Sequence, residues 1–512
     1  MVKGRSLTER ASLGALSNAV RIVVTMVAGL LITPLIVRAL GQELYGVWAM
    51  IQQVLGYVQL ANLRTTGTIK LTLAVDLHRD DPHYKRQQIG ATLHVLARVA
   101  LVMLAIGAAL VWLAPSIIKI SPGHASTVRW ALGIGVISLV TGELSSIPGN
   151  VLRGMNLEYA AMGLSAVVGG TQSVLGMLAV LAGLGMPGLA LAAVMADFIE
   201  GGTRLYIAKT HVPWLGVEKP TSNVLKVFWA QTIWISFATL GFILQNATDI
   251  LVVGLVLGPS AAAVFGATGS VLRMITSSMY SFIGAANPGI AALCGRGEWE
   301  RVEAVRNELH LGSLVATAIV GCGVIAMNHA FVSLWLGANF YGGNGLNLLL
   351  VMIAIQSIPL RLDTMLLDSM LKFRERAVLT IITGATGLGL GAVLGLRFGL
   401  SGMALGLVTG NMSALVAMSV VIYRNSPLSF ARYLAWMTRP VCVLALLFAG
   451  AYAIAFDRLT VVNFVMRAVT VGATSAVIMV YVGLGRRQRA ALANRFAGQF
   501  SAITRYIWRK RA

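Results

Sequence analysis

The fold of this chain is decided by one stretch of sequence, Gly29-Leu-Leu-Ile-Thr-Pro34-Leu-Ile-Val-Arg38-Ala-Leu-Gly41-Gln-Glu-Leu-Tyr45-Gly46-Val-Trp48. It joins two long apolar runs, 13–39 and 45–71, which separate at Gly41. Each run exceeds the roughly 20 mainly apolar residues that a bilayer-spanning helix needs. The stretch therefore predicts a hairpin of two transmembrane helices, with Pro34 inside the first.

The composition extends this interpretation to the whole chain. Of the 512 residues, 57% are hydrophobic and only 12% are charged, whereas a soluble domain has about 25% charged residues. We expect an all-α polytopic membrane protein of about fourteen transmembrane helices. The expected helices are 13–39, 45–71, 89–115, 125–152, 158–184, 187–209, 223–257, 261–290, 307–333, 346–371, 376–398, 402–424, 432–456 and 461–485.

The basic residues follow a membrane topology and not a nucleic-acid surface. A net charge of +21 is compatible with nucleic-acid binding, but most of the 40 Lys and Arg lie in alternate loops, as the positive-inside rule requires. This pattern puts both termini in the cytoplasm and argues against nucleic acid as a partner. Three scattered cysteines are too few for a disulfide framework or a metal site.

Three matched pairs of segments indicate an internal duplication. They are Ile36-Val-Arg-Ala-Leu-Gly41 with Gly254-Leu-Val-Leu-Gly258, Leu152-Arg153 with Leu371-Lys372, and Gly185-Met-Pro-Gly188-Leu-Ala-Leu191 with Gly399-Leu-Ser-Gly402-Met-Ala-Leu405. All three pairs share an offset of roughly 215 residues, as a duplicated unit would. Because six helices separate the two starts, we expect parallel repeats, whose two six-helix lobes enclose a central cavity and rock to open it to each side.

The repeat sets the expected domain organisation. Its parts are an N-lobe over 1–209, a C-lobe over 223–424, two extra helices over 432–485 and a basic tail over 486–512. Apolar residues recur in the tail at helical spacing among arginines, which predicts a helix lying on anionic lipid headgroups. The alternative is a frayed basic terminus.

Five arginines are expected within the spans, where a charge is costly and therefore faces a cavity or a partner. They are Arg21 in the first helix, Arg64 in the second, Arg98 in the third, Arg273 in the eighth and Arg361 in the tenth. A guanidinium binds phosphate through a fork of donors and keeps its charge when poorly hydrated, so these residues predict a cationic binding cavity. Alternatively, some snorkel to a membrane face, as we consider for Arg64 and Arg98, or pair with acids, as Glu200 and Arg204 are spaced to do.

Acidic residues within the spans raise the question of ion coupling. Asp197, Glu200 and Asp249 are the candidates to take up a proton or Na+ and drive exchange between the lobes. Asp249, which precedes Gly258 by nine residues, also suits a structural role. No metal, nucleotide or other cofactor is expected.

The pattern Pro-x-x-x-Arg-x-Leu-Gly-x-x-x-Tyr-Gly, which runs from Pro34 to Gly46, resembles the polysaccharide flippases of the multidrug/oligosaccharidyl-lipid/polysaccharide (MOP) exporter superfamily. The resemblance implies a flippase for undecaprenyl-pyrophosphate-linked oligosaccharide in the bacterial cytoplasmic (inner) membrane, serving lipopolysaccharide, O-antigen or exopolysaccharide synthesis. It implies that Arg21, Arg64 and Arg273 converge from both lobes. It also implies membrane lipids and polysaccharide polymerase or chain-length machinery as partners.

Two other functions stay open. A cation-coupled drug or metabolite exporter of the same superfamily would have an acidic or aromatic cavity, against which the arginines argue. A membrane glycosyltransferase, polymerase or ligase would carry catalytic groups on sizeable external loops, and we find no such loop longer than roughly a dozen residues. We therefore expect a transporter and not an enzyme.

Overall fold

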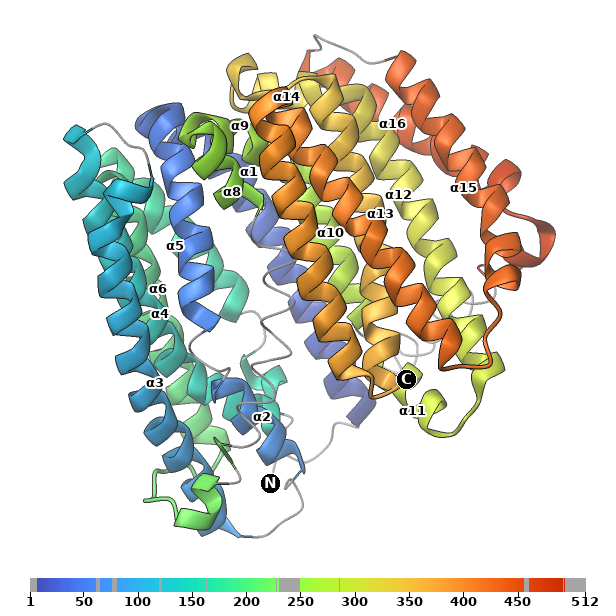
Figure 1. Ribbon diagram of the computed structural model, residues 1–512. Coiled ribbons are helices and arrows are strands. Elements are labelled where there is room, and N and C mark those ends of the chain that lie inside the picture. Colours follow the sequence, from blue (N-terminus) through green and yellow to red (C-terminus); the bar gives the residue numbers. More distant parts are fainter. Residues whose placement is uncertain are drawn as a thin grey trace, which may run out of the picture. The chain divides into compact units, whose positions relative to one another are not determined.

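The computed structural model describes residues 7–60, 65–75, 81–118, 122–155, 157–161, 164–226, 228–229, 249–284, 286–454, 460–490 and 492. Every regular element in these ranges is a helix (Figure 1). Eight of the described helices are long and apolar enough to cross a membrane. The protein is thus an all-α polytopic membrane protein, as the sequence predicts.

Two of the described helices each contain a kink at a glycine. α1 (Leu7–Leu60) continues through Gly41 and α14 (Phe373–Arg424) continues through Gly399, and both glycines have non-helical backbone angles. Each of these long elements therefore corresponds to two expected helices. Most of the expected helix 223–257 lies outside the described residues, and its end is the short α8 (Asp249–Leu257).

The chain divides into two compact units, 1–263 and 264–512. Besides α1 and α8, the first unit contains α2 (Thr65–Val75), α3 (Pro82–Ile117), α4 (Ala125–Gly154), α5 (Leu164–Leu181), α6 (Gly185–His211) and the start of α9 (Pro259–Thr268). α4 is central, since it contacts α2, α3 and α6, while α5 packs between α1 and α6. Asp81 begins α3 by accepting a hydrogen bond from the Tyr84 backbone N–H at 2.9 Å, which satisfies one of the unpaired donors of the first turn.

The first unit extends beyond the lobe that the repeat predicts because α8 packs on α1. Gly46 and Gly254 permit this close contact. A Cβ at Gly46 would lie 1.9 Å from the Pro259 carbonyl oxygen, and one at Gly254 would lie 2.2 Å from the Met50 sulfur. Gly46 thus lets two backbones meet, and Gly254 makes room for the Met50 side chain.

The second unit is built around α12 and α13. Its helices are α10 (Ser270–Gly284), α11 (Asn287–Gly295), α12 (Trp299–Trp335), α13 (Asn344–Ser369), α14, α15 (Phe430–Ala453) and α16 (Val461–Ile478), which continues into a π-helical turn, η4 (Met479–Gly483). α12 contacts α13, α15 and α16, and α13 contacts α10 and α14. A buried apolar core that includes Leu309, Met365 and Met418 joins α12, α13 and α14.

The backbone supports the internal duplication. Gly41 and Gly258, which the repeat matches, have φ angles of 78° and 98°, and the matched Gly185 and Gly399 have φ angles of 52° and 60°. Left-handed backbone strongly favours glycine, so each matched pair keeps the same residue for the same physical reason. The third matched pair also lies at a common feature, because α4 ends at Gly154 and α13 ends at Ser369.

Candidate functional site: a polar cavity in the first unit

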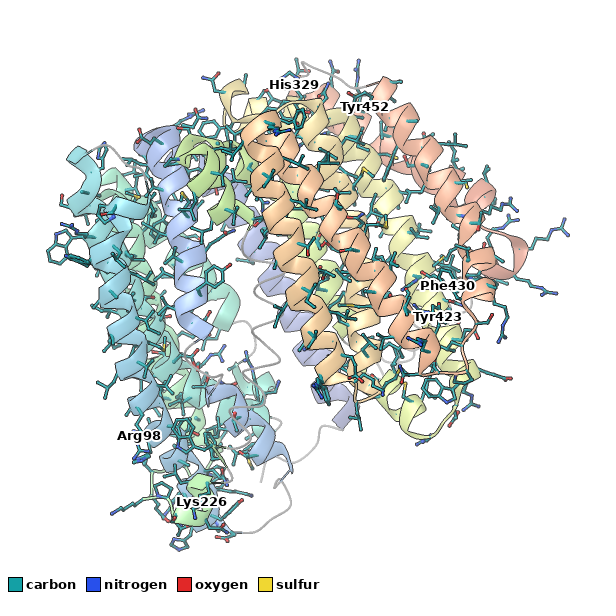
Figure 2. The ribbon with its side chains drawn as sticks, viewed as in Figure 1. Arg98, Lys226, His329, Tyr423, Phe430 and Tyr452 are labelled. Atoms are coloured by element: carbon teal, nitrogen blue, oxygen red, sulfur yellow. The ribbon has the colours of Figure 1, made fainter. Side chains whose placement is uncertain are left out.

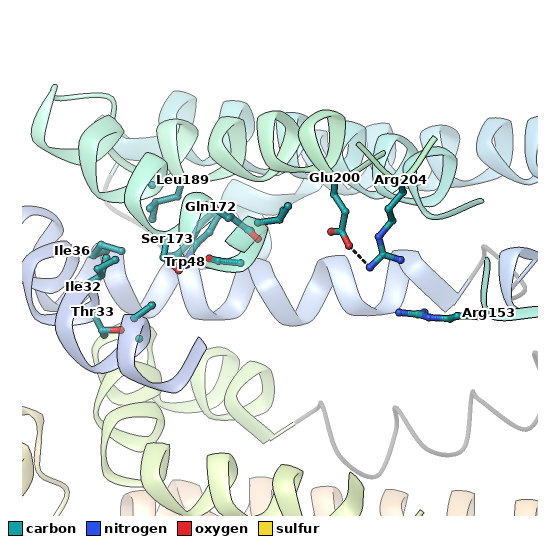
Figure 3. A pocket seen from close by; sticks show the side chains of 15 residues that line it. Ile32, Thr33, Ile36, Trp48, Arg153, Gln172, Ser173, Leu189, Glu200 and Arg204 are labelled. Carbon is teal, nitrogen blue, oxygen red and sulfur yellow. Dashed lines mark hydrogen bonds and ion pairs between the residues drawn. The ribbon is translucent and has the colours of Figure 1, made fainter. Parts of the chain in front are cut away.

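A cavity of about 670 Å³ lies among α1, α4, α5 and α6 (Figure 3). We call it the N-cavity. Its polar and aromatic lining consists of Thr33, Trp48, Arg153, Gln172, Ser173, Glu200 and Arg204. Its volume lies within the range of roughly 300–1,000 Å³ that is typical of ligand sites.

Small residues on α1 and α5 leave this space open. Gly29 lines the N-cavity, and a Cβ added there would meet no atom within 4 Å. On α5, Gly169, Ser173 and Gly176 line the wall at helical spacing. Gln172 adds an amide group to α5, whose other residues in this region are apolar or small. The sequence of α5 therefore forms one wall that has both room and hydrogen-bonding groups.

The charges of the N-cavity come from α4 and α6. Arg204 Nη2 lies 2.6 Å from Glu200 Oε1, one helical turn away, which confirms the predicted pairing (Figure 3). Gly149 makes room for this guanidinium, because a Cβ there would lie 2.0 Å from Arg204 Nη1. Arg153, one turn after Gly149 on α4, also lines the cavity. Among the described lining residues, two guanidinium groups thus outnumber one carboxylate.

The structure places Arg98 away from the N-cavity. Its side chain is exposed on α3 beside Leu101 and Val102, which are 69% and 52% exposed. Figure 2 shows it on the outside of this helix. This placement agrees with the snorkelling alternative for Arg98. Arg64 and the side chain of Arg21 lie outside the described residues.

Arg273 and Arg361 belong to the second unit, where both contact protein groups. Arg273 Nη2 donates to the backbone oxygen of Gly266 at the end of α9. The Arg361 guanidinium lies 5.8 Å from the centre of the Tyr280 ring, so it bridges α13 and α10. Neither contact tests a role in substrate binding, which stays a prediction for both arginines.

The predicted acids occupy three different environments. Glu200 lines the N-cavity in its ion pair. Asp197, one turn earlier on α6, accepts hydrogen bonds through Oδ2 from Ser138 Oγ at 3.1 Å and Thr141 Oγ1 at 3.2 Å, both from α4. Asp249 accepts a bond from Gln53 Nε2 at 3.2 Å, while Gln53 Oε1 accepts from the Leu251 N–H at 2.6 Å. Asp249 therefore helps to fix the start of α8 on α1.

The second unit contains a buried polar group that the sequence did not reveal, which we call the Arg306 cluster. It consists of Arg306, His310, Asp363, Tyr423 and Tyr433. Arg306 Nη2 lies 2.7 Å from Asp363 Oδ1, and Arg306 Nη1 donates to Tyr423 Oη at 2.7 Å. The guanidinium also lies 4.7 Å from the centre of the Tyr433 ring. Carboxylate, hydroxyl and aromatic groups thus surround this charge.

The site predicted from the sequence does not include several residues of the N-cavity. Arg153 appears in the sequence prediction only in the repeat pair Leu152-Arg153, and Gln172 and Ser173 do not appear in it. The polar pair inside the apolar helix α5 is the signal that could have indicated Gln172 and Ser173. Among the described residues, no group of three or more His, Cys, Asp or Glu is arranged to hold a metal ion.

Comparisons with known proteins support the fold. No family model matches the chain. The uncharacterized membrane protein EpsK of Bacillus subtilis (strain 168) is 21% identical over 315 residues, which is 60% of this chain and 62% of that protein. The chain thus matches less than two thirds of that relative's length.

Two solved structures share the fold. One is the lipid II flippase MurJ in an inward closed conformation, with a TM-score of 0.61, 11% identity and coverage of 91% of this chain and 97% of MurJ. The other is an inward-facing multidrug resistance MATE transporter of the MOP superfamily, with a TM-score of 0.58 and 15% identity. The match covers 80% of this chain and 98% of the transporter. The protein therefore has the fold of MOP-superfamily transporters.

Proposed function

We propose that this protein is a flippase. Its substrate is a polyprenyl-pyrophosphate-linked oligosaccharide, which it moves across the bacterial cytoplasmic membrane for envelope polysaccharide synthesis by alternating access. The observation that carries the proposal is the N-cavity, which combines two guanidinium groups with neutral hydrogen-bonding groups inside a membrane-spanning unit. Charged and polar groups within membrane-spanning helices are costly, and they mark the paths of polar substrates or ions.

The chemistry of the lining suits both parts of such a headgroup. Arg153 and Arg204 supply forked donors for phosphate oxygens. Gln172, Ser173 and Thr33 supply amide and hydroxyl groups that can donate to and accept from sugar hydroxyls. Trp48 adds an aromatic surface with one polar edge.

Helical periodicity connects Arg21 with this cavity. Arg21 precedes Ala28, which lines the N-cavity, by seven residues. Positions seven apart in a helix lie on nearly the same face. We therefore include Arg21 in the proposed binding surface, and we keep Arg273, Arg361 and Arg64 as candidates from the other spans.

The comparisons support this class of substrate without identifying it. MurJ is described as a lipid II flippase, so one protein with this fold acts on a lipid-linked substrate. A drug exporter is the second candidate, because the multidrug transporter has the same fold. The excess of guanidinium over carboxylate in the N-cavity favours an anionic cargo over a cationic drug.

For energy coupling, we propose Asp197 as the residue that takes up a proton or Na+. Two hydroxyl groups from α4 surround its Oδ2, and Glu200 of the N-cavity lies one helical turn away on α6. Uptake of a cation at Asp197 would change the field at Glu200 and Arg204. Polymerase or chain-length proteins are proposed partners that would receive the exported unit.

The experiment is a complementation assay of polysaccharide export with matched arginine variants. Arg153→Gln and Arg21→Gln each remove one charged donor, and a hydrogen bond to a charged group contributes about 1.5–3 kcal/mol, or at least about tenfold in binding. We expect export to fall by about that factor at equal protein levels in the membrane. Arg98→Gln, on the exposed face of α3, is the control and should export normally.

Export at the wild-type rate from both cavity variants would exclude the N-cavity from the transport path. Equal loss in the Arg98→Gln control would show that the assay reports on protein quality instead of substrate binding. Drug resistance conferred by the wild-type protein, without polysaccharide export, would favour the exporter.

A further inference from the structure

A second cavity lies on the second unit, between α15 and α16. Its volume is about 560 Å³. Its lining runs from Val443 to Ile454, over α15 and the residue that follows it, and from Thr470 to Val482, over α16 and η4, with Cys322 of α12 behind it. We call it the α15–α16 groove. Its walls are mostly aliphatic, and Leu446 beside it is 73% exposed.

The groove has the length of an acyl chain. Val443 and Ile454 are eleven positions apart, which corresponds to about 16 Å along a helix at 1.5 Å per residue. This distance is about half of the hydrocarbon core of a bilayer, which is roughly 30 Å thick. Gly450 keeps the groove open, since a Cβ there would meet no atom within 4 Å.

An arginine closes one end of the groove. Arg439 lies one turn before Val443 on α15, and its Nε donates to the Val482 backbone oxygen at 2.9 Å. This bond joins α15 to η4 at the point where the groove ends. It uses only Nε, so the two terminal nitrogens of this exposed guanidinium can donate to an anion.

Two more arginines are brought to the same end by the backbone that follows. In η4, the Leu484 N–H donates to the Met479 oxygen at 3.0 Å, five residues back, and such π-turns occur frequently at functional sites. Gln488 then fixes the next segment, because its Nε2 donates to the Trp436 oxygen of α15 at 2.6 Å. Arg486 and Arg487 lie in this segment, and both are exposed.

We propose that the α15–α16 groove binds an anionic phospholipid of the surrounding membrane. One acyl chain occupies the aliphatic groove, and the phosphate headgroup contacts Arg439, Arg486 and Arg487 at its end. Charge complementarity selects the ligand, because guanidinium groups bind phosphate strongly. Three arginines together favour a headgroup with a net negative charge over a neutral or cationic one. This site does not depend on the proposed flippase activity.

The experiment measures lipid binding to the purified full-length protein by native mass spectrometry. The probes are phosphatidylglycerol, phosphatidylcholine and soluble glycerophosphoglycerol. Each arginine near a membrane surface is worth about 1 kcal/mol, or about fivefold, so the triple variant Arg439→Gln/Arg486→Gln/Arg487→Gln should bind phosphatidylglycerol about a hundredfold more weakly. Arg424→Gln, an exposed arginine at the end of α14, is the matched control and should bind normally.

Filling the groove tests the acyl-chain part separately. Gly450→Phe adds a ring to open space and should weaken phosphatidylglycerol binding at least about tenfold while the apparent Tm stays near that of the wild type. Equal binding of phosphatidylglycerol and phosphatidylcholine by the wild type, or unchanged binding by the triple variant, would overturn the headgroup site. Binding of glycerophosphoglycerol as tight as that of the lipid, or normal binding by Gly450→Phe, would overturn the groove.

Discussion

Each of the two units contains an ion pair between an arginine and a carboxylate, and the two pairs lie in different surroundings. In the first unit, Arg204 and Glu200 lie 2.6 Å apart, and their side chains are 8% and 31% exposed beside the N-cavity. In the second unit, Arg306 and Asp363 lie 2.7 Å apart, and their side chains are 5% and 3% exposed. Both arginines are largely buried, so the two pairs differ in their acids: protein encloses Asp363, whereas Glu200 is partly exposed beside the N-cavity.

The difference arises from the neighbours of each guanidinium. Tyr423 and Tyr433 cover Arg306 with a hydroxyl and an aromatic face. Gly149 faces Arg204 and provides only a flat backbone surface. Aromatic side chains thus cover Arg306, whereas Arg204 packs against the Gly149 backbone and lines the N-cavity.

The largest expected effect is on stability, from Asp363→Ala. This change leaves the buried Arg306 charge without its carboxylate, which typically costs about 3–5 kcal/mol. We expect a fall of several degrees in the apparent Tm of the purified protein in detergent. Arg301→Ala is the control, because that side chain is 73% exposed in its pair with Glu298 and such pairs contribute about 1 kcal/mol or less. Equal Tm shifts for both variants would remove the distinction between buried and open pairs.

An intermediate effect is expected from Tyr433→Phe. The change removes the hydroxyl that shares a 2.7 Å hydrogen bond with His310 Nδ1 and keeps the ring that lies over Arg306. One such bond contributes about 0.5–1.5 kcal/mol. A small decrease in Tm should result, and Tyr452→Phe on the exposed side of the same helix should give none. A decrease as large as that of Asp363→Ala would mean that the tyrosine hydroxyl and not the ion pair holds the cluster.

The smallest effect on stability is expected from Glu200→Gln. The Gln amide oxygen can still accept a hydrogen bond from Arg204, whose side chain is 8% exposed, so the Tm should fall far less than in Asp363→Ala. Substrate binding should change instead, because Arg204 loses its competing carboxylate and becomes a better donor to phosphate. We expect tighter binding of a polyprenyl-pyrophosphate lipid in a fluorescence-quenching titration. Weaker binding would show that Glu200 itself contacts the cargo.

The sequence predicts the helical framework well because that framework follows from local properties. Apolar runs set the helices, and the breaks at Gly41 and Gly399 follow from glycine's access to left-handed backbone. The pairing of Glu200 with Arg204 follows from helical spacing alone.

The site was harder to predict because it depends on packing between helices. Nothing local indicates that Arg153 of α4 and Glu200 of α6 line the same space as Gln172 of α5. By its position in the sequence, Arg306 belongs to a basic loop. Only the packing of α13 against α12 shows that it is buried with Asp363. Charge patterns assign a topology, but they do not distinguish an arginine that packs from one that binds.

The matched glycines also determine what the protein presents to water. Gly41, Gly185, Gly258 and Gly399 each reverse the chain between two consecutive spans, with only a few residues at the tip. Each of these tips exposes little backbone between its two helices. Tips this short offer little to antibodies or proteases, so an epitope tag is better inserted into a longer connection, such as the one between α12 and α13.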